Sequence, residues 1–253
     1  MRFIMNEKQA RVYELLKEFI NIAEKHNLKY MMMYGSLIGI KRHNGFIPWD
    51  DDIDLVIPKE TLDFLIEHYP SKVYTPENGN SPLLIPKFTN DSPDNEDAVF
   101  IDLFLSIPTT LKKVKKFLSL KNKIRFLHTF THRKIFKRLW GMNLLKFLCI
   151  WTWMFKKLKI NNAYDDLYVE NGDKALVLYT LFNKETYKNT YSRLDYDSCM
   201  EAKFHDLNVK IPSNWEEILV QTYGENWKTP IKYKNCEHFG LYDLQMFMFK
   251  KKK

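Results

Sequence analysis

The sequence predicts a protein of the α+β class, in which a core of alternating helices and strands is followed by a basic helical segment. Apolar residues make up 45% of the 253 residues, which is enough to bury a sizeable core. Over residues 1–110, stretches with apolar side chains at helical spacing alternate with short β-rich runs, which indicates an α+β or α/β core.

Charge divides the chain further. Residues 111–160 contain 15 lysines and arginines and no acidic residue, whereas the rest of the chain has 24 basic and 31 acidic residues. Such a local excess calls for a local explanation. We therefore expect a catalytic core at 1–110, a basic aromatic helical insert at 111–160, and a helical and short-stranded part at 161–253 that completes the single domain.

The individual elements follow from hydrophobic spacing and turn signals. In the core we expect a helix at 7–26, a strand at 29–34, a short helix after Gly35-Ser36, a turn at Asn44-Gly45, a strand at 46–58, a helix through Leu62, Leu65 and Ile66, and strands at 81–90 and 98–108. Beyond it we expect two helices around a weak point near Gly141, helical structure at 161–190, short strands at 191–211, and a helix at 213–224 capped by Ser213 and Glu216.

The strongest chemical signal is the acidic run WDDDID. On a strand, Asp50, Asp52 and Asp54 fall on one face, because side chains alternate. Carboxylates two residues apart then lie about 6–7 Å apart, a spacing that lets them share a hard divalent cation such as Mg²⁺. Asp102, in the apolar run FIDLF, would complete the site from a neighbouring strand.

Two other interpretations of this run are weaker. A solvated acidic edge is disfavoured, since aspartate is depleted in strands and neighbouring like charges cost stability. A Ca²⁺ loop would need the EF-hand spacing, which is missing.

Upstream, Gly35-Ser36 ends a strand and opens a helix, where free N–H groups bind phosphate. Strand, Gly-Ser, helix, turn, Asp-x-Asp strand and third aspartate together form the layout of the nucleotidyltransferase fold.

The segment YGSLIGIKRHNGFIPWDDDIDLVIP, residues 34–58, closely resembles the signature of the LicD family, which also includes fukutin-related proteins. FIDLF resembles the family's second acidic motif, and residues 211–230 are similar to its C-terminal motif, where a short helix ends in Tyr-Gly. Met31 to Met33 and Ser36 are mild variants of the usual residues.

The resemblance implies a nucleotidyltransferase-like mixed sheet with flanking helices. It also implies a transferase that uses Mg²⁺ (or Mn²⁺) to move a phosphocholine-like group from a CDP-linked small alcohol to a hydroxyl of a glycan acceptor, at the cell surface or on a lipid carrier. On this chain Asp50, Asp52 and Asp54 match the metal-binding cluster. Asp102 matches the remaining acidic position, as general base or as a third metal ligand.

Further residues are candidates for binding the donor. Lys41, Arg42 and His43 precede the turn and could reach its phosphates, or they could form a solvated helix C-terminus that the helix dipole favours. Lys87 on its strand is a similar candidate. Together with Gly35 and Ser36, these residues form the expected substrate-binding set.

The insert contains the apolar run Leu144 to Phe155, twelve residues with one lysine, which is too short for a span of about 20 residues. Lysines and arginines flank it, and three of the six tryptophans lie at Trp140, Trp151 and Trp153. This composition suits an interfacial helix on an anionic membrane, or else a helical subdomain packed on the core. No motif that reads RNA or DNA accompanies the charge, so nucleic acid is not an expected partner.

The cellular setting follows from absences in the sequence. Cys149, Cys199 and Cys236 form no CxxC pair, which fits reduced thiols. The N-terminus lacks the pattern of a signal peptide, so we expect a cytoplasmic protein, peripheral on the inner face of the membrane if the insert binds lipid. Two alternatives to the phosphotransferase are a glycosyltransferase that uses its Asp-x-Asp on a nucleotide sugar, which lacks the strand–Gly-Ser–helix order, and a non-catalytic membrane-associated scaffold, which intact carboxylates disfavour.

Overall fold

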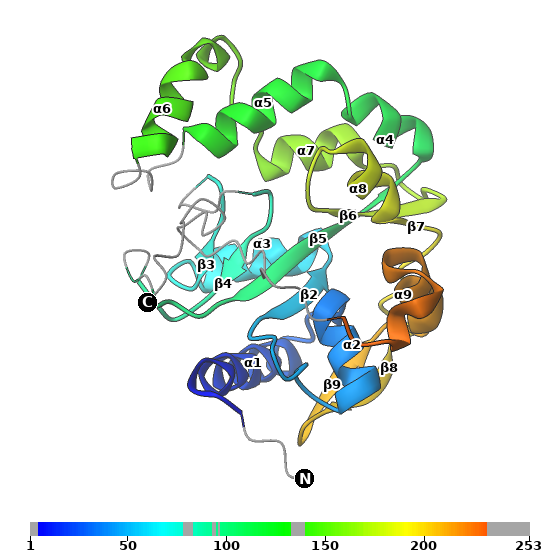
Figure 1. Cartoon of the computed structure of the whole chain (residues 1–253). Helices are drawn as coiled ribbons and strands as arrows, with labels where there is room; N and C mark the ends of the chain where they lie inside the picture. Colours follow the sequence, from blue (N-terminus) through cyan, green and yellow to red (C-terminus); the bar gives the residue numbers. More distant parts are fainter. Residues whose placement is uncertain (1–4, 78–82, 93–94, 96, 133–139, 232–253) are drawn as a thin grey trace.

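A mixed β-sheet crosses the middle of the molecule, with helices on both sides of it (Figure 1). The computed structural model describes residues 5–77, 83–92, 95, 97–132 and 140–231. The strands are β1 (Met31–Met32), β2 (Ile53–Ile57), β3 (Val73–Tyr74), β4 (Lys87–Phe88), β5 (Ile101–Thr109), β6 (Lys174–Leu178), β7 (Thr190–Tyr191), β8 (Met200–Phe204) and β9 (Leu207–Ile211). The helices are α1 (Glu7–Lys25), α2 (Tyr34–His43), α3 (Lys59–His68), α4 (Leu111–Phe117), α5 (Leu120–Thr131), α6 (Trp140–Leu148), α7 (Ile160–Leu167), α8 (Asn183–Lys188) and α9 (Trp215–Tyr223), with 3-10 turns η1 (Ile150–Met154) and η2 (Glu225–Lys228).

Strand β5 organises the sheet. It runs parallel to β2, in register from Ile53 beside Ile101 to Ile57 beside Leu105. Along its other edge, β4 pairs antiparallel with its first residues and β6 antiparallel with its last ones. β1 extends the sheet from β2, β3 from β4 and β7 from β6, whereas β8 and β9 form a separate hairpin. Parallel and antiparallel pairs in one sheet, with flanking helices, confirm the predicted α+β class.

The N-terminal helix is close to its prediction. α1 begins with a reciprocal cap, in which Asn6 Oδ1 accepts from the Gln9 backbone N–H and Gln9 Oε1 accepts from the Asn6 backbone N–H. Its apolar face is buried against the sheet. The Phe19 ring meets the rings of Tyr30 and Phe88 edge to face, each with centroids 5.5 Å apart.

The strand predicted at 46–58 is wrong in its first half. Only Ile53–Ile57 form β2, and residues 50–52 precede the strand in a loop. Pro48 and Trp49 occupy a turn closed by a 2.9 Å hydrogen bond from the Asp50 N–H to the Ile47 carbonyl, a place that suits proline. The alternation along one continuous strand therefore does not explain how Asp50 and Asp52 come close to Asp54.

Other boundaries also differ from their predictions. Residues 161–190 are not helical throughout, because β6 adds an edge to β5 over five residue pairs and sheet pairing overrides local propensity. The strand expected at 81–90 is reduced to β4, with 81–82 outside the described residues. Gly141 lies inside α6, and α9 starts without a side-chain cap, next to Asn214. The other expected helices and strands are present, with boundaries shifted by a few residues.

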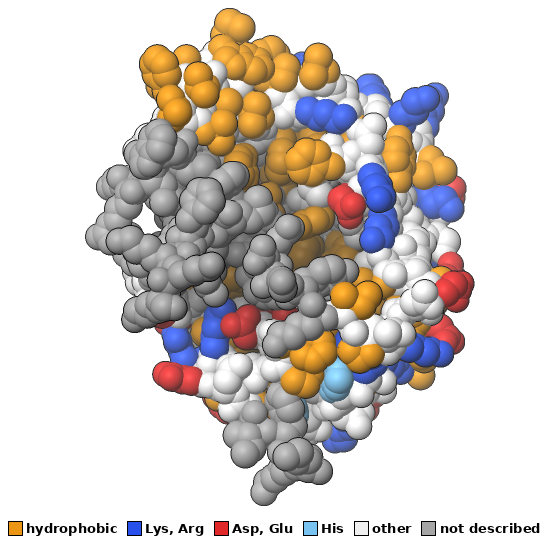
Figure 2. Space-filling view, viewed as in Figure 1, with side chains coloured by type: hydrophobic (Ala, Val, Ile, Leu, Met, Phe, Trp, Pro, Cys, Tyr) orange, Lys and Arg blue, Asp and Glu red, His pale blue; other side chains and the backbone are white. Residues whose placement is uncertain are grey.

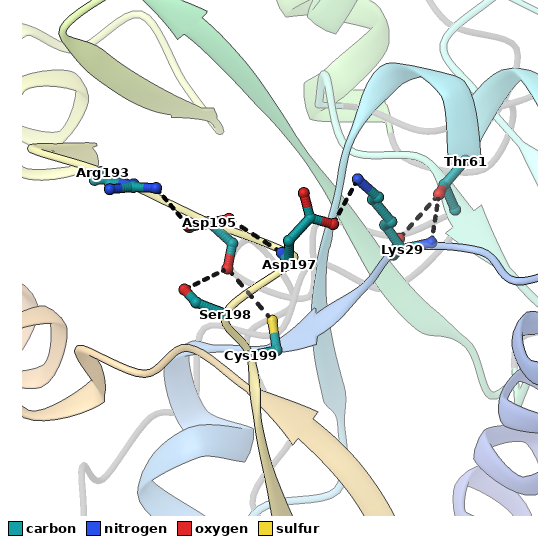
Figure 3. Close-up of polar contacts among 7 residues, drawn as sticks. All are labelled: Lys29, Thr61, Arg193, Asp195, Asp197, Ser198 and Cys199. Atoms are coloured by element: carbon teal, nitrogen blue, oxygen red, sulfur yellow. Dashed lines mark hydrogen bonds and ion pairs between the residues drawn. The ribbon is translucent and has the colours of Figure 1, made fainter.

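A polar cluster joins the segment before β8 to the core (Figure 3). Asp195 pairs with Arg193, and the Lys29 ammonium lies 2.9 Å from the Asp197 carboxylate. The Lys29 backbone N–H donates to Thr61 Oγ1, whose hydroxyl donates back to the Lys29 carbonyl at 2.9 Å. The segment is thereby linked to the start of β1 and to α3.

The basic insert forms α4, α5, α6 and η1, which Figure 1 shows together with α7 above the sheet. α4 packs on α7, and η1 packs on α5. Among the described residues, no helix is both long and apolar enough to cross a membrane.

Candidate functional site: a carboxylate cluster at the β2–β5 pair

Two of the predicted aspartates lie side by side on the central strands. Asp54 and Asp102 are register partners on parallel β2 and β5, so their side chains leave the same face of the sheet. Lys87 is the register partner of Asp102 on β4, and its ammonium forms an ion pair with the Asp102 carboxylate. Phe104, two residues after Asp102, extends this face with an aromatic ring.

Asp54 is fixed by the loop and helix that follow β1. The Gly35 N–H donates to Asp54 Oδ2 at 3.1 Å, and the Asp54 N–H donates to Ser36 Oγ at 2.9 Å. The backbone at Tyr34 has φ 49°, a left-handed conformation that is uncommon for a residue other than glycine. The first turn of α2 thus meets a carboxylate, as the helix dipole favours. Gly35 and Ser36, predicted to bind substrate, here position Asp54.

Gly35 also brings a second carboxylate into place. A Cβ at this position would lie 2.9 Å from Asp50 Oδ2 and 3.5 Å from Asp54 Oδ2, so both carboxylates rest against the same glycine. The backbone at Asp50 is held by Gln9, whose Nε2 donates to the Asp50 carbonyl at 2.7 Å. A larger residue than glycine would displace the Asp50 carboxylate from this place.

The turn between β8 and β9 supports the same loop from its other end. The His205 N–H donates to the Asn44 carbonyl at 2.6 Å, and the Phe46 N–H donates to His205 Nε2 at 3.2 Å. The His205 ring packs edge to face against Tyr13, with centroids 5.5 Å apart, and at a tilt against Phe46, with centroids 5.7 Å apart. Residues distant in sequence therefore fix the path of the chain towards Asp50 and Asp52.

Burial and mutual repulsion make it unfavourable for the carboxylates of this cluster to carry charge. Burial raises the pKa of the Asp54 carboxyl well above its usual range, and the charges of Asp52, Asp102 and Asp50 raise it further. The Gly35 N–H acts in the opposite direction. We call Asp50, Asp52, Asp54 and Asp102 the carboxylate cluster. Clustered negative charge of this kind is typical of functional sites.

Three members of the cluster line a cavity of about 290 Å³. Its polar lining consists of Lys8, Asp51, Asp52, Asp54, Lys87, Asp102, Glu185, Lys188, Asn189 and Thr222, and its aromatic lining of Tyr34, Phe100, Phe104, Tyr179 and Tyr223. The ring centroids of Tyr34 and Phe104 are 4.8 Å apart, and those of Phe104 and Tyr179 are 6.0 Å apart. Acidic and basic side chains thus share the cavity with an aromatic wall.

The donor atoms of the cluster suit a hard divalent cation, since carboxylate oxygens are the ligands that Mg²⁺ prefers. A cation there would offset the repulsion that raises the pKa of Asp54. Within the described ranges, however, no three His, Cys, Asp or Glu side chains are already arranged to hold a metal ion together. Asp102, one of the four carboxylates, is paired with Lys87.

Three predicted phosphate ligands lie elsewhere. Lys41 is stacked on the Trp215 ring, with Nζ 3.8 Å from its centroid, and Arg42 Nη1 donates to the Trp227 carbonyl at 3.1 Å. Neither they nor His43 belong to the cavity lining. The C-terminal end of α2 packs on α9, and Arg42 contacts η2, while binding of the donor phosphates by these side chains stays a prediction.

Sequence reasoning missed the aromatic wall and the residues from α8. Tyr34 and Tyr223 could have been predicted, because each stands beside a glycine in a segment that resembles a family motif. Tyr179, Glu185, Lys188 and Asn189 carry no local signal. They reach the cavity only because β6 pairs with β5 and brings the following helix to this face.

Comparisons with known proteins agree with this geometry. Residues 27–132 match the family model described as LicD/FKTN/FKRP, nucleotidyltransferase domain. The chain is 22% identical over 249 residues to a lipopolysaccharide cholinephosphotransferase LicD of Haemophilus influenzae, covering 90% of this chain and 93% of that protein. Shorter matches, at 42% and 40% identity, are to uncharacterised proteins of Rickettsia typhi and Rickettsia prowazekii, and span only 19% and 21% of their lengths. The residues that match the LicD/FKTN/FKRP model, 27–132, include all four members of the carboxylate cluster.

Proposed function

We propose that this protein is a metal-dependent phosphotransferase that moves a phosphocholine-like group from a CDP-linked alcohol to a hydroxyl of a glycan, with lipopolysaccharide as the class of acceptor. The observation that carries the proposal is the carboxylate cluster, which opens into a cavity that also has lysines and an aromatic wall. The Haemophilus relative, whose name states cholinephosphotransfer to lipopolysaccharide, supports the choice of reaction.

The cluster provides the residues for binding the donor diphosphate. Asp50, Asp52 and Asp54 would hold Mg²⁺ or Mn²⁺, which when bound neutralises charge on the phosphates and on the departing nucleotide. Lys188 lines the same cavity, and an ammonium group can bind a phosphate oxygen. Gly35 keeps Asp50 and Asp54 at one place, so the ligands are oriented before the donor arrives.

Asp102 is the proposed general base. It lies on the strand beside Asp54, with its carboxylate partly exposed to the cavity, so an acceptor hydroxyl bound there can give up its proton to it. The buried Lys87 ammonium pairs with Asp102 and fixes its orientation. If Asp102 is instead a third metal ligand, the same pairing tunes how strongly it binds.

The aromatic wall favours a cationic alcohol. Tyr34, Phe104 and Tyr179 present ring surfaces around one side of the cavity, and Glu185 adds a carboxylate to the lining. Ring faces attract quaternary ammonium groups by cation–π interaction, worth about 0.5–2 kcal/mol for each good contact. A choline-like head group fits this combination better than an uncharged alcohol does.

The test is to incubate the purified protein with CDP-choline, CDP-ethanolamine, CDP-glycerol and CDP-ribitol, with a lipopolysaccharide acceptor, and to measure CMP release. We expect release that needs Mg²⁺ or Mn²⁺, stops with a chelator, and is fastest with CDP-choline. Metal-independent release, or equal rates for all four donors, would contradict the proposal.

Two controls separate the alternatives. A parallel panel of nucleotide sugars tests the glycosyltransferase, which would release UDP or GDP with transfer of the sugar. Calorimetric titration of CDP-choline in the presence of metal tests the scaffold, which would bind no donor. Heat released on binding of CDP-choline, together with CMP release, is the expected outcome.

A further inference from the structure

The end of the basic insert exposes a concentration of large apolar side chains. Figure 2 shows hydrophobic side chains gathered at the top of the molecule, in the region where Figure 1 places α6. The side chains that form this patch are between 46% and 81% exposed, and we call them the apolar cap: Leu144, Phe147, Leu148, Ile150, Trp151, Trp153 and Met154. Apolar patches of this kind mark interaction sites, because isolated soluble proteins rarely maintain them.

η1 buries a polar residue and exposes its tryptophans, which is the reverse of what a helix packed on the core does. The small polar Thr152 is fully buried, with its hydroxyl donating to the Cys149 carbonyl at 2.6 Å, whereas its neighbours Trp151 and Trp153 point outward. A short helix that only packed on the core would bury its tryptophans and expose its threonine. The exposed rings are therefore not a core face left open by chance.

Basic side chains border the apolar cap. Lys156 and Lys159 follow η1 and are exposed, and the Lys157 ammonium donates to the His132 carbonyl at 2.8 Å. The His132 ring packs on Trp153, with centroids 5.6 Å apart, so this lysine lies beside the tryptophans. Residues 111–160 contain no aspartate or glutamate to balance these charges.

We propose that the apolar cap inserts into the interfacial layer of an anionic bilayer, with Lys156, Lys157 and Lys159 among the lipid head groups. Nine residues of α6 span about 14 Å, half the roughly 30 Å of a hydrocarbon core, so the segment lies along the surface and does not cross it. Tryptophan rings prefer this layer, and each lysine near an anionic surface adds about tenfold or less to the affinity.

The charge argues for lipid over a second copy of the chain. A symmetric dimer through the apolar cap would bring together two copies of a segment with 15 basic and no acidic residues, which is unfavourable. The inference goes beyond the proposed transferase activity and does not depend on it, since binding to vesicles requires neither donor nor metal.

The experiment is flotation of the full chain with vesicles of phosphatidylcholine alone, or with about a quarter of phosphatidylglycerol, at low salt. We expect the wild type to float with the anionic vesicles and to remain below with the neutral ones. The double variant Phe147→Ser/Met154→Ser should lower the bound fraction by about tenfold or more, because it removes two of the most exposed apolar side chains.

A matched control makes the same substitution, phenylalanine to serine, outside the apolar cap. Phe182 is 71% exposed, as Phe147 is 69% exposed, but it precedes α8, so Phe182→Ser should leave flotation unchanged. Lys156→Glu/Lys159→Glu should remove the preference for anionic vesicles. All three variants keep buried residues intact, and an unchanged melting temperature checks their folds.

Several outcomes would overturn the proposal. It fails if the wild type does not float, if Phe182→Ser lowers binding as much as the cap variant, or if charge reversal has no effect. Sedimentation without vesicles tests whether a second copy of the chain covers the apolar cap instead. If the wild type is a dimer that Phe147→Ser/Met154→Ser converts to a monomer, the apolar cap is a self-association surface and the membrane proposal is wrong.

Discussion

Asp52-Ile53-Asp54 and Asp195-Tyr196-Asp197 share the same Asp-x-Asp spacing but have opposite surroundings. In the first, burial and neighbouring carboxylates raise the pKa of Asp54. In the second, the Asp197 N–H donates to Asp195 and lowers its pKa, and Arg193 pairs with it (Figure 3). Asp197 is largely exposed and pairs with Lys29. The spacing alone therefore identifies no site; what distinguishes the first pair is the negative charge that the fold gathers around it.

The largest expected difference between the two pairs is in catalysis. Asp52→Asn/Asp54→Asn should lower metal-dependent CMP release by about 10³-fold or more, because the carboxylates that would hold the cation are lost. Asp195→Asn/Asp197→Asn should change the rate by about twofold or less, since those side chains do not line the cavity and make exposed surface contacts.

Both double variants must remain folded for this comparison to be informative, and circular dichroism and the melting temperature check that. Equal loss of activity in the two variants would mean that the carboxylate cluster has no special role. Full activity in Asp52→Asn/Asp54→Asn would contradict the proposed function outright.

The contrast also shows what the sequence could and could not predict. The order of elements up to β5 follows from local signals, such as the apolar spacing of α1 and the turn at Asn44. The gathering of Asp54 and Asp102 was predicted correctly, because both lie on short apolar runs that are typical of neighbouring strands. The reason given for Asp50 and Asp52 was wrong, since they reach the cluster through the loop that follows the turn at Pro48.

Residues that long-range pairing brings to the site had no such signal. Lys188 and Asn189 line the cavity because β6 joins the far edge of β5, and this pairing leaves no periodic pattern in their own segment. Lys41 and Arg42 stand beside the motif in the sequence, but Trp215 and Trp227, far later in the chain, set the direction of their side chains, and this carries no local signal either.

A smaller difference is expected in the free energy of unfolding, when the Lys87–Asp102 pair and the Lys29–Asp197 pair are each broken. Asp102→Asn should lower the free energy of unfolding by about 3–5 kcal/mol, because it leaves the Lys87 ammonium, only 3% exposed, buried without its carboxylate. Asp197→Asn should cost about 1 kcal/mol or less, because the Lys29–Asp197 pair is well exposed. Urea unfolding at neutral pH measures both.

Removing the buried charge as well tests the physical reason. Lys87→Met/Asp102→Asn should recover a large part of the stability that Asp102→Asn loses, because no unpaired ammonium is then left in the core. If the double variant is no more stable than Asp102→Asn alone, the loss comes from packing and not from the uncompensated charge.

The smallest expected difference is the pH dependence of stability, measured by melting temperature with a chelator present. At neutral pH Asp54→Asn should be more stable than the wild type, because burial and the neighbouring charges disfavour ionisation of Asp54 in the folded protein, whereas the same side chain ionises freely in the unfolded chain. As the pH falls through the raised pKa of Asp54 that advantage shrinks, and it is gone near the ordinary pKa of about 3.9.

Asp195 should behave in the opposite way. Its pKa is lowered by the Asp197 N–H and by Arg193, so its carboxylate stabilises the folded state above the ordinary pKa of about 3.9, and that contribution is lost only as the pH falls further. Asp195→Asn should therefore be slightly less stable than the wild type at neutral pH, with the deficit closing at acid pH. The stability difference between variant and wild type should therefore have opposite signs for Asp54→Asn and Asp195→Asn, because one carboxylate is surrounded by negative charge and the other by hydrogen-bond donors. The same sign for both variants would show that the two Asp-x-Asp pairs do not differ in the way their surroundings indicate.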